Sequence, residues 1–209
     1  MATVKALKRP GGEFGASGRV PLAADADAVL ALVADVESQP EWNRGVKAAR
    51  VEEALGCNES TVAQTLEWRF LALRGAMHLR LRQSVDAAAR CITTRLLRGT
   101  MMRSFGSKVV VESCGPGSCQ LSMELYMHPS IAVPPGVRPF VGQQVRRQLH
   151  SVLTDLKAHV DARAGASGGG SSSDGGGASG SDGGGSATPS PCPSRSPSPP
   201  ASSRASSVL

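Results

Sequence analysis

The stretch Met77-His78-Leu79-Arg80-Leu81-Arg82-Gln83-Ser84-Val85 carries the clearest pattern in the sequence and decides the fold class. Apolar residues stand at positions 77, 79, 81 and 85, and polar or basic residues stand between them. Successive side chains of a β-strand point to opposite faces of the sheet. A period of two therefore predicts a strand with one face turned to a core and the other turned to solvent.

Further strands are expected on both sides of this stretch. Strand patterns cover residues 19–22, 46–54, 61–73, 91–98, 102–114 and 121–127. The connections between the last six strands are short, and Gly115-Pro116-Gly117-Ser118 is a strong hairpin signal. Because a parallel crossover needs about a dozen residues, these strands must be antiparallel neighbours. The patterns predict a seven-stranded antiparallel meander that twists and curls.

Helices are expected after the first strand and at the end of the domain. Asp25 can cap a helix that Pro40 ends, and residues 41–45 then form a second short helix or turn. Residues 137–163 carry apolar side chains three and four positions apart, which indicates one long amphipathic helix. Its length of about 40 Å requires a broad apolar partner. The sequence predicts an α+β fold in which the curled sheet wraps around this long C-terminal helix.

Both ends of the chain differ in composition from its middle. Of the 45 residues from Gly165 to Leu209, 32 are Gly, Ser or Pro, which bury almost no apolar surface. We expect residues 164–209 to be a disordered tail, whose Ser-Pro pairs are either phosphorylation sites or products of the composition. Residues 1–14 are basic without a following apolar stretch, and we expect a disordered leader or the remnant of a targeting segment. One domain at residues 15–163 lies between these ends.

The composition excludes several classes of protein. No apolar run approaches the roughly 18 residues that a membrane-spanning helix needs, and the N-terminus lacks the apolar core of a secretory signal. The five cysteines stand at irregular spacing, which fits a reducing compartment better than a disulfide framework. We therefore expect an intracellular protein of the cytosol, chloroplast or mitochondrion that is neither secreted nor membrane-spanning.

Local motifs add a family resemblance. The segment Val33-Ala34-Asp35-Val36-Glu37-Ser38-Gln39-Pro40-Glu41-Trp42 is similar to a V-x-D-x-x-x-x-P-x-W pattern of the helix-grip superfamily, which includes START lipid-transfer domains, polyketide cyclase/dehydrase proteins and ubiquinone-binding proteins. Met102-Arg103-Ser104-Phe105-Gly106 resembles the Phe-Gly strand of that superfamily, although Lys108, Val109 and Val110 stand where a Trp often follows. The resemblance covers about residues 15–163. It implies a helix-grip fold holding a hydrophobic ligand between sheet and helix, without implying catalysis.

The candidate ligand site combines one face of the expected strands with the long helix. Its members are mostly large and apolar, and methionines among them adapt well to irregular ligands. These candidate ligand-binding residues are Trp42, Leu66, Trp68, Phe70, Met77, Leu79, Leu81, Phe105, Leu121, Met123, Leu125, Met127, Val145 and Leu149. For each of them, packing in a solid core is the alternative. Trp42 can be a gate, a membrane-touching ring or an anchor for the short helix.

Side chains capable of acid-base chemistry are scarce in this set. Gln64 and Gln83 are the polar residues on the core-facing parity, while Glu67, Glu112 and Glu124 fall on the opposite parity unless a bulge shifts the register. The four histidines have no partner at metal-ligand spacing. We therefore expect no metal and no cofactor, and the sequence assigns no catalytic residue.

Basic residues gather on the opposite parity of the strands. They can attract anionic lipid headgroups at a membrane surface or form a plain solvated face, and they are Arg69, Arg80, Arg82, Arg95, Arg98 and Arg103. Nucleic acid is not expected as a partner, because aromatic residues make up 3% of the chain. We expect binding or transfer of a hydrophobic small molecule or lipid, such as a quinone, an isoprenoid or a fatty acid. The alternatives are a cyclase- or dehydrase-type enzyme and a membrane-associated assembly or interaction module.

Overall fold

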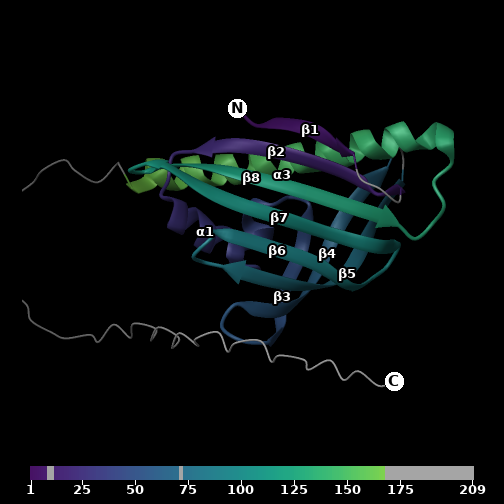
Figure 1. Ribbon diagram of the computed structural model, residues 1–209, viewed down its shortest axis with the longest axis horizontal. Coiled ribbons are helices and arrows are strands. Elements are labelled where there is room, and N and C mark those ends of the chain that lie inside the picture. Colours follow the sequence, from purple (N-terminus) through teal and green to yellow (C-terminus); the bar gives the residue numbers. More distant parts are fainter. Residues whose placement is uncertain (9–11, 71–72, 168–209) are drawn as a thin grey trace, which may run out of the picture. The chain divides into compact units, whose positions relative to one another are not determined.

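A single antiparallel sheet forms most of the domain in the computed structural model (Figure 1). The structure describes residues 1–8, 12–70 and 73–167, without the side chains of residues 8, 68–74 and 167. The strands pair in the order β1-β2-β8-β7-β6-β5-β4-β3. Their bounds are β1 Thr3–Lys8, β2 Phe14–Leu22, β3 Val46–Ala54, β4 Glu59–Phe70, β5 Leu73–Asp86, β6 Cys91–Gly99, β7 Met102–Gly115 and β8 Ser118–Pro129. The six strands from β3 to β8 are consecutive neighbours, which confirms the expected meander.

The sheet has eight strands where the sequence predicted seven. The additional strand, β1, lies in the segment expected to be a disordered leader, and it pairs antiparallel with β2 from Thr3↔Arg19 to Lys8↔Phe14. The free edge of β2 offers backbone hydrogen bonds to any extended segment, so β1 needs no apolar alternation of its own.

Helices lie near the predicted positions, but the first ends at Ala34 rather than at Pro40, and Pro40 lies within the second, which was expected at residues 41–45. The helices are α1 (Ala26–Ala34), α2 (Gln39–Trp42) and α3 (Arg138–Ser167), with the short 3-10 turn η2 (Pro135–Val137) directly before α3. The last helix extends four residues beyond the expected end at Arg163, and the remainder of the expected tail lies outside the described residues. None of the helices in the described part of the chain is both long and apolar enough to cross a membrane.

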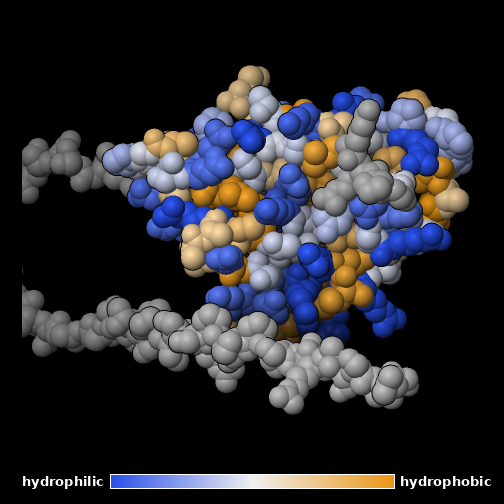
Figure 2. Space-filling view, viewed as in Figure 1, coloured by the Kyte–Doolittle hydropathy of each residue, from blue (hydrophilic) through white to orange (hydrophobic). Residues whose placement is uncertain are grey.

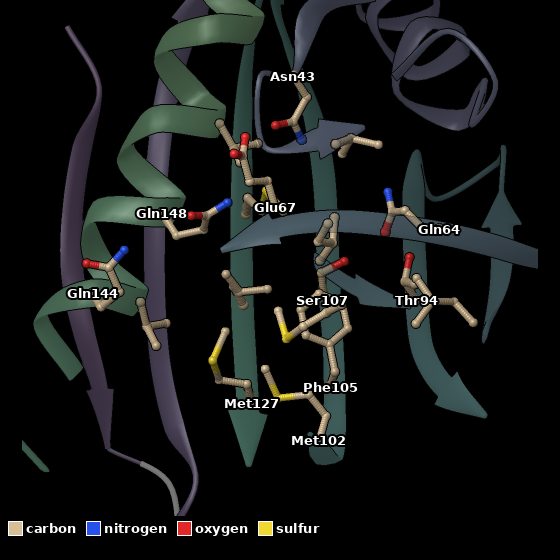
Figure 3. A pocket seen from close by; sticks show the side chains of 18 of the residues that line it. Asn43, Gln64, Glu67, Thr94, Met102, Phe105, Ser107, Met127, Gln144 and Gln148 are labelled. Atoms are coloured by element: carbon tan, nitrogen blue, oxygen red, sulfur yellow. The ribbon is translucent and has the colours of Figure 1, made fainter. Parts of the chain in front are cut away.

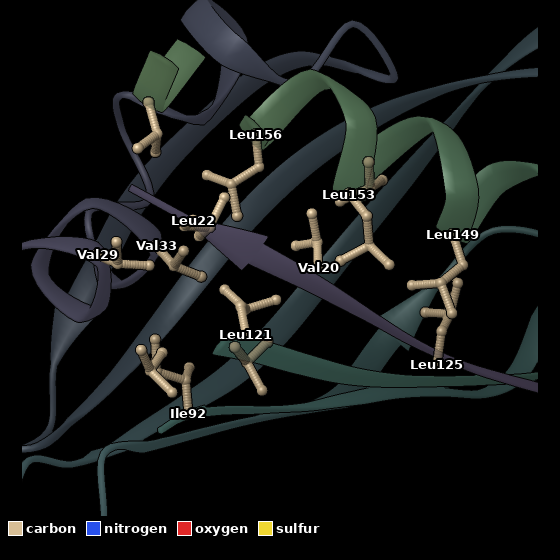
Figure 4. Close-up of a cluster of buried hydrophobic side chains, with 14 of the residues drawn as sticks. Val20, Leu22, Val29, Val33, Ile92, Leu121, Leu125, Leu149, Leu153 and Leu156 are labelled. Atoms are coloured by element: carbon tan, nitrogen blue, oxygen red, sulfur yellow. The ribbon is translucent and has the colours of Figure 1, made fainter. Parts of the chain in front are cut away.

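The long helix α3 lies along one side of the sheet and packs mainly against β2, with further contacts to β1 and β8 (Figure 1). Leu149, Leu153 and Leu156 of α3 are fully buried against the apolar residues that β2 and β8 turn inward (Figure 4). Gly18 of β2 permits this approach, since a Cβ atom there would lie 2.6 Å from Cδ1 of Leu153. The main core of the domain is therefore the layer between α3 and the β2–β8 half of the sheet.

We expect the substitution Leu153→Ala to lower the free energy of unfolding by about 2–5 kcal/mol, because it leaves a cavity in this layer. Urea denaturation followed by circular dichroism measures this loss. Leu97→Ala is the matched control: Leu97 is 50% exposed, against 0% for Leu153. Its replacement should change the stability by no more than about 0.5 kcal/mol. Equal losses in the two variants would contradict the packing of α3 on β2.

Candidate functional site

A cavity of about 550 Å³ lies between the inner face of the sheet and the helices. Because α3 packs chiefly on β2, it does not cover the apolar inner faces of β4 to β7, and α1 contacts β7 at one end of this region. Val62, Leu81, Ile92 and Val109 from these four strands form part of the cavity wall. A space of this size matches the range of small-molecule binding sites, which is roughly 300–1,000 Å³.

Ten of the fourteen candidate ligand-binding residues line this cavity. They are Trp42, Leu66, Met77, Leu81, Phe105, Leu121, Met123, Leu125, Met127 and Val145. Leu79 packs instead into a small cluster with Val36 and Val62, and Leu149 lies in the closed core under α3. The side chains of Trp68 and Phe70 lie outside the described part of the structure. The alternation of the strands therefore identified eight wall residues, and Trp42 and Val145 come from helices.

Trp42, the last residue of α2, is buried, and its ring forms part of the cavity wall. Its indole N–H is also covered and has no hydrogen-bond partner among the described residues. A ring that touches a membrane would have to be exposed. The structure thus places Trp42 as a wall residue that holds α2 against the cavity.

One end of the cavity is apolar and rich in sulfur. Met102, Phe105 and Met127 converge there in Figure 3. Met101 and Ile131 continue the wall outward and are largely exposed, and the backbone N–H of Ser130 donates to the carbonyl of Met101 at 2.9 Å. The turn between β6 and β7 and the segment after β8 therefore form an apolar rim at which the cavity meets solvent. We call this rim the mouth, defined by Met101 and Ile131.

The other end of the cavity is polar and is built around Gly45. The N–H of Gly45 donates to Oδ1 of Asn43 at 3.0 Å, and its carbonyl accepts from the N–H of Glu67 at 2.9 Å. A Cβ atom on Gly45 would lie 2.7 Å from Nε2 of Gln148, so the end of this side chain from α3 lies directly against the glycine. We call Asn43, Glu67 and Gln148 the polar end of the cavity; Figure 3 shows them gathered on one side of it.

Glu67 corrects the prediction that its side chain lies on the face away from the cavity. Its carboxylate pairs with Lys47 at 3.1 Å, yet the residue lines the cavity wall. The pairing of β3 with β4 shifts register between Val46 and Ala48, so Lys47 is the extra residue and the irregularity lies in β3. The pairing of β4 with β5 continues through Glu67 without a shift. Leu66 and Glu67 both line the cavity, and parity along β4 alone therefore does not decide which residues reach its wall.

Several further polar residues of the wall were missed by the sequence analysis. They are Gln39, Asn43, Thr94, Ser107, Gln144 and Gln148. Gln144 and Gln148 stand four residues apart on α3, which places their side chains on one face of the helix. Val145 follows Gln144 directly and also lines the cavity, so the helical spacing contained a signal for both glutamines.

An ion pair fixes the loop of the polar end to α3. Nε and Nη2 of Arg44 donate to Oδ1 of Asp155 at 3.0 and 2.6 Å, and the backbone N–H of Arg44 donates to Oδ2 at 3.4 Å. Asp155 is buried, whereas 81% of the Arg44 side chain is exposed. The hydrogen bond to Asp155, together with its charge, raises the pKa of Arg44 above its ordinary value. Arg44 thus remains a cation, and the loop at residues 43–45 stays anchored to the helix.

The comparison with protein families agrees with this geometry. Residues 14–161 match the sequence model of the family described as polyketide cyclase / dehydrase and lipid transport. The chain belongs to this family, and its sheet with the long C-terminal helix has the helix-grip fold. No curated protein matches the chain in sequence.

Solved structures share this fold at low sequence identity. A START superfamily protein from Mycobacterium smegmatis is 20% identical, with a TM-score of 0.63 over 71% of this chain and 98% of that chain. The Zhui aromatase/cyclase from Streptomyces sp. R1128 is 18% identical, with a TM-score of 0.65 over 75% of this chain and 99% of that one. A STAR-related lipid transfer protein from Xanthomonas axonopodis is 14% identical, with a TM-score of 0.58 over 77% and 93%. At these identities the similarity defines the fold alone.

We expect the substitution Asp155→Asn to loosen the loop at residues 43–45, because it removes the charge that holds Arg44. Hydrogen exchange at the Gly45 amide should become faster, and the Tm should fall. Asp161→Asn is the matched control, since Asp161 pairs with Lys157 on the exposed side of the same helix at 2.9 Å. It should leave exchange at Gly45 unchanged and lower the Tm less. Unchanged exchange in Asp155→Asn would show that Arg44 does not anchor this loop.

Proposed function

We propose that this protein binds a hydrophobic small molecule or lipid in the cavity between its sheet and α3. The observation that carries this proposal is a cavity of about 550 Å³ whose wall is predominantly apolar. Membership of a family described by polyketide cyclases, dehydrases and lipid transport supports it. The ten candidate residues that line the cavity are the proposed ligand contacts. Quinones and isoprenoids are ligands of suitable polarity for such a wall.

Affinity would come mainly from the removal of apolar ligand surface from water, at about 25 cal/mol per Å². Met102, Met123 and Met127 line the cavity, and their flexible thioether side chains can adapt to ligands of irregular shape. The mouth at Met101 and Ile131 gives the ligand an apolar path between solvent or a membrane and the cavity. Exchange through this mouth would allow the protein to transfer its ligand as well as hold it.

An enzyme of the cyclase or dehydrase type is the alternative proposal. Glu67 is the titratable side chain that lines the cavity among the residues with described side chains, and it is the candidate proton acceptor. General acid-base chemistry on a bound ligand usually employs two such groups with different proton affinities. The described wall offers one, and this favours binding over catalysis.

A second proposed role is peripheral contact with an anionic membrane through the outer face of the sheet. The pairing of β5 with β6 places Arg80 opposite Arg98, and Arg82 opposite Arg95. Like charges directly opposite each other on neighbouring strands repel and destabilise the sheet. An anionic partner bound to these arginines would reduce that repulsion. Arg80 pairs with Glu52 at 2.7 Å, whereas Arg82, Arg95 and Arg98 are exposed and have no ion pair among the described residues. Figure 2 shows strongly hydrophilic side chains over this part of the sheet.

The binding proposal is tested by filling the cavity. Ser107 of β7 lines it, and the neighbouring Lys108 is exposed on the opposite face of the same strand. We expect Ser107→Phe to weaken binding of the neutral fluorescent probe N-phenyl-1-naphthylamine by at least about tenfold, because the new ring occupies ligand space. Lys108→Phe should bind the probe as the unaltered protein does. Equal binding by both variants would contradict the proposed site.

The natural ligand is identified by extracting the purified full-length protein with organic solvent and analysing the extract by mass spectrometry. A stoichiometric apolar compound in the extract is the expected result. Its loss in Ser107→Phe but not in Lys108→Phe would assign the compound to the cavity. An empty extract, repeated after incubation with a lipid mixture, would favour the enzyme or the interaction module.

The membrane contact is tested with vesicles that contain phosphatidylserine. Each arginine near an anionic surface contributes about 1 kcal/mol, which is roughly fivefold in affinity. We expect the double substitution Arg82→Gln/Arg95→Gln to weaken vesicle co-sedimentation by about an order of magnitude or more at low salt. Arg146→Gln/Arg147→Gln removes the same charge from exposed positions on α3 and should have a smaller effect. Equal effects would indicate non-specific attraction by the net charge of +6.

A further inference from the structure

The charge of the cavity wall is unusual for a protein with an excess of basic residues. The folded region holds nearly all of the 23 lysines and arginines of the chain. Nevertheless, no Lys, Arg or His lines the cavity among the residues with described side chains, and Glu67 is the one charged residue there. The basic groups all lie on other surfaces of the described domain. The cavity therefore has the opposite electrostatic character from the exterior.

An anionic ligand group would be poorly bound in this cavity. Burial of a carboxylate or phosphate requires a cation or several hydrogen-bond donors in compensation, because the loss of hydration costs several kcal/mol. Lys47, which pairs with the wall residue Glu67 at 3.1 Å, does not itself line the cavity. An anion at the polar end would instead meet the Glu67 carboxylate and be repelled by it.

The neutral polar side chains of the wall divide into two groups. The first group forms hydrogen bonds within the protein. Nε2 of Gln64 donates to Oε1 of Gln39 at 2.6 Å, and Nε2 of Gln83 donates to the carbonyl of Ala34 at 2.8 Å. The carboxamides of Gln144 and Gln148 have no hydrogen-bond partner among the described residues. Both line the cavity, and Figure 3 shows the carboxamide of Gln148 directed toward Glu67, with Gln144 one turn away along α3.

Each free carboxamide offers two N–H donors and one carbonyl acceptor. A ligand hydroxyl, ketone or amide placed beside Gln148 would satisfy both kinds of group without bringing charge into the cavity. Asn43 adds a further amide from the opposite side, since both Asn43 and Gln148 lie against Gly45. The apolar remainder of the ligand would then extend past Ser107 toward Met102, Phe105 and Met127.

We propose that the cavity selects uncharged amphiphiles, such as alcohols, ketones, quinones or sterol-like molecules, and discriminates against fatty acids and phosphorylated lipids. The free carboxamides of Gln148 and Gln144 recognise the polar group of the ligand, and the Glu67 carboxylate repels anions. This inference rests on the proposed binding function and narrows its substrate class. Of the ligands that the sequence suggested, it retains the neutral quinones and isoprenoids and excludes fatty acids.

The experiment compares three probes with the same chain length: 1-tetradecanol, methyl tetradecanoate and tetradecanoate at pH 8, where the acid is ionised. Each probe displaces N-phenyl-1-naphthylamine from the full-length protein. We expect the alcohol and the ester to bind at least about tenfold more tightly than the carboxylate. Equal or tighter binding of tetradecanoate would overturn the inference while leaving the proposed binding function intact. If neither the fluorescent probe nor any competitor binds, the proposed function itself fails.

Two substitutions assign the selectivity to residues. Glu67→Gln should strengthen tetradecanoate binding several-fold and leave methyl tetradecanoate unchanged, because it removes the repelling charge while Lys47 remains largely exposed. Gln148→Leu should weaken the alcohol several-fold relative to N-phenyl-1-naphthylamine. Gln143→Leu is its matched control, since Gln143 lies on the same helix but is exposed. Selectivity that is unchanged in both Glu67→Gln and Gln148→Leu would show that the polar end does not recognise the ligand.

Discussion

The packing of α3 against β2 is the contact on which the rest of this structure depends. Leu149 and Leu153 are completely buried there, and Gly18 lets the helix approach the strand more closely than any larger residue would. A helix held this tightly at one side of a curled sheet cannot also cover the other side. The inner faces of β4 to β7 are consequently apolar but uncovered by α3, and the cavity is the space that results. Stability and ligand capacity thus derive from the same asymmetric placement of one helix.

Much of this arrangement could be predicted from the sequence, because periodicity reports directly on burial. The alternation from Met77 to Val85 and from Leu121 to Met127 identified strands with one apolar face, and eight of the candidate residues on the strands line the cavity. Periodicity does not distinguish a cavity wall from a closed core. Val145 lines the cavity and Leu149, one turn later, does not, although both belong to the same apolar stripe of α3. That difference depends on which neighbour each residue meets in three dimensions.

The features that the sequence did not predict are β1, the position of Glu67 and the contact between Gln148 and Gly45. Each depends on how backbone segments are arranged, which the pattern of side chains does not reveal. The strand β1 forms because β2 has a free edge, and six residues with little apolar alternation are sufficient to occupy it. Glu67 lines the cavity beside Leu66, although neighbouring residues of a strand point to opposite faces. The side chain of Gln148 lies against Gly45, a contact that is apparent only once α3 is in place. Both positions depend on how distant segments meet in three dimensions.

The order of elements along the chain has a consequence for how the protein is made. Strand β2, near the N-terminus, completes its core only with β8 and α3, which the ribosome synthesises more than one hundred residues later. During translation the apolar face of β2 is therefore exposed until β8 and α3 have been synthesised. Contacts between segments so far apart in the sequence also form slowly. The hairpin of β1 and β2 can form early, and β1 then pairs with one edge of β2. Its backbone pairing would thereby shield the nascent chain from the edge-to-edge association that unpaired strands invite.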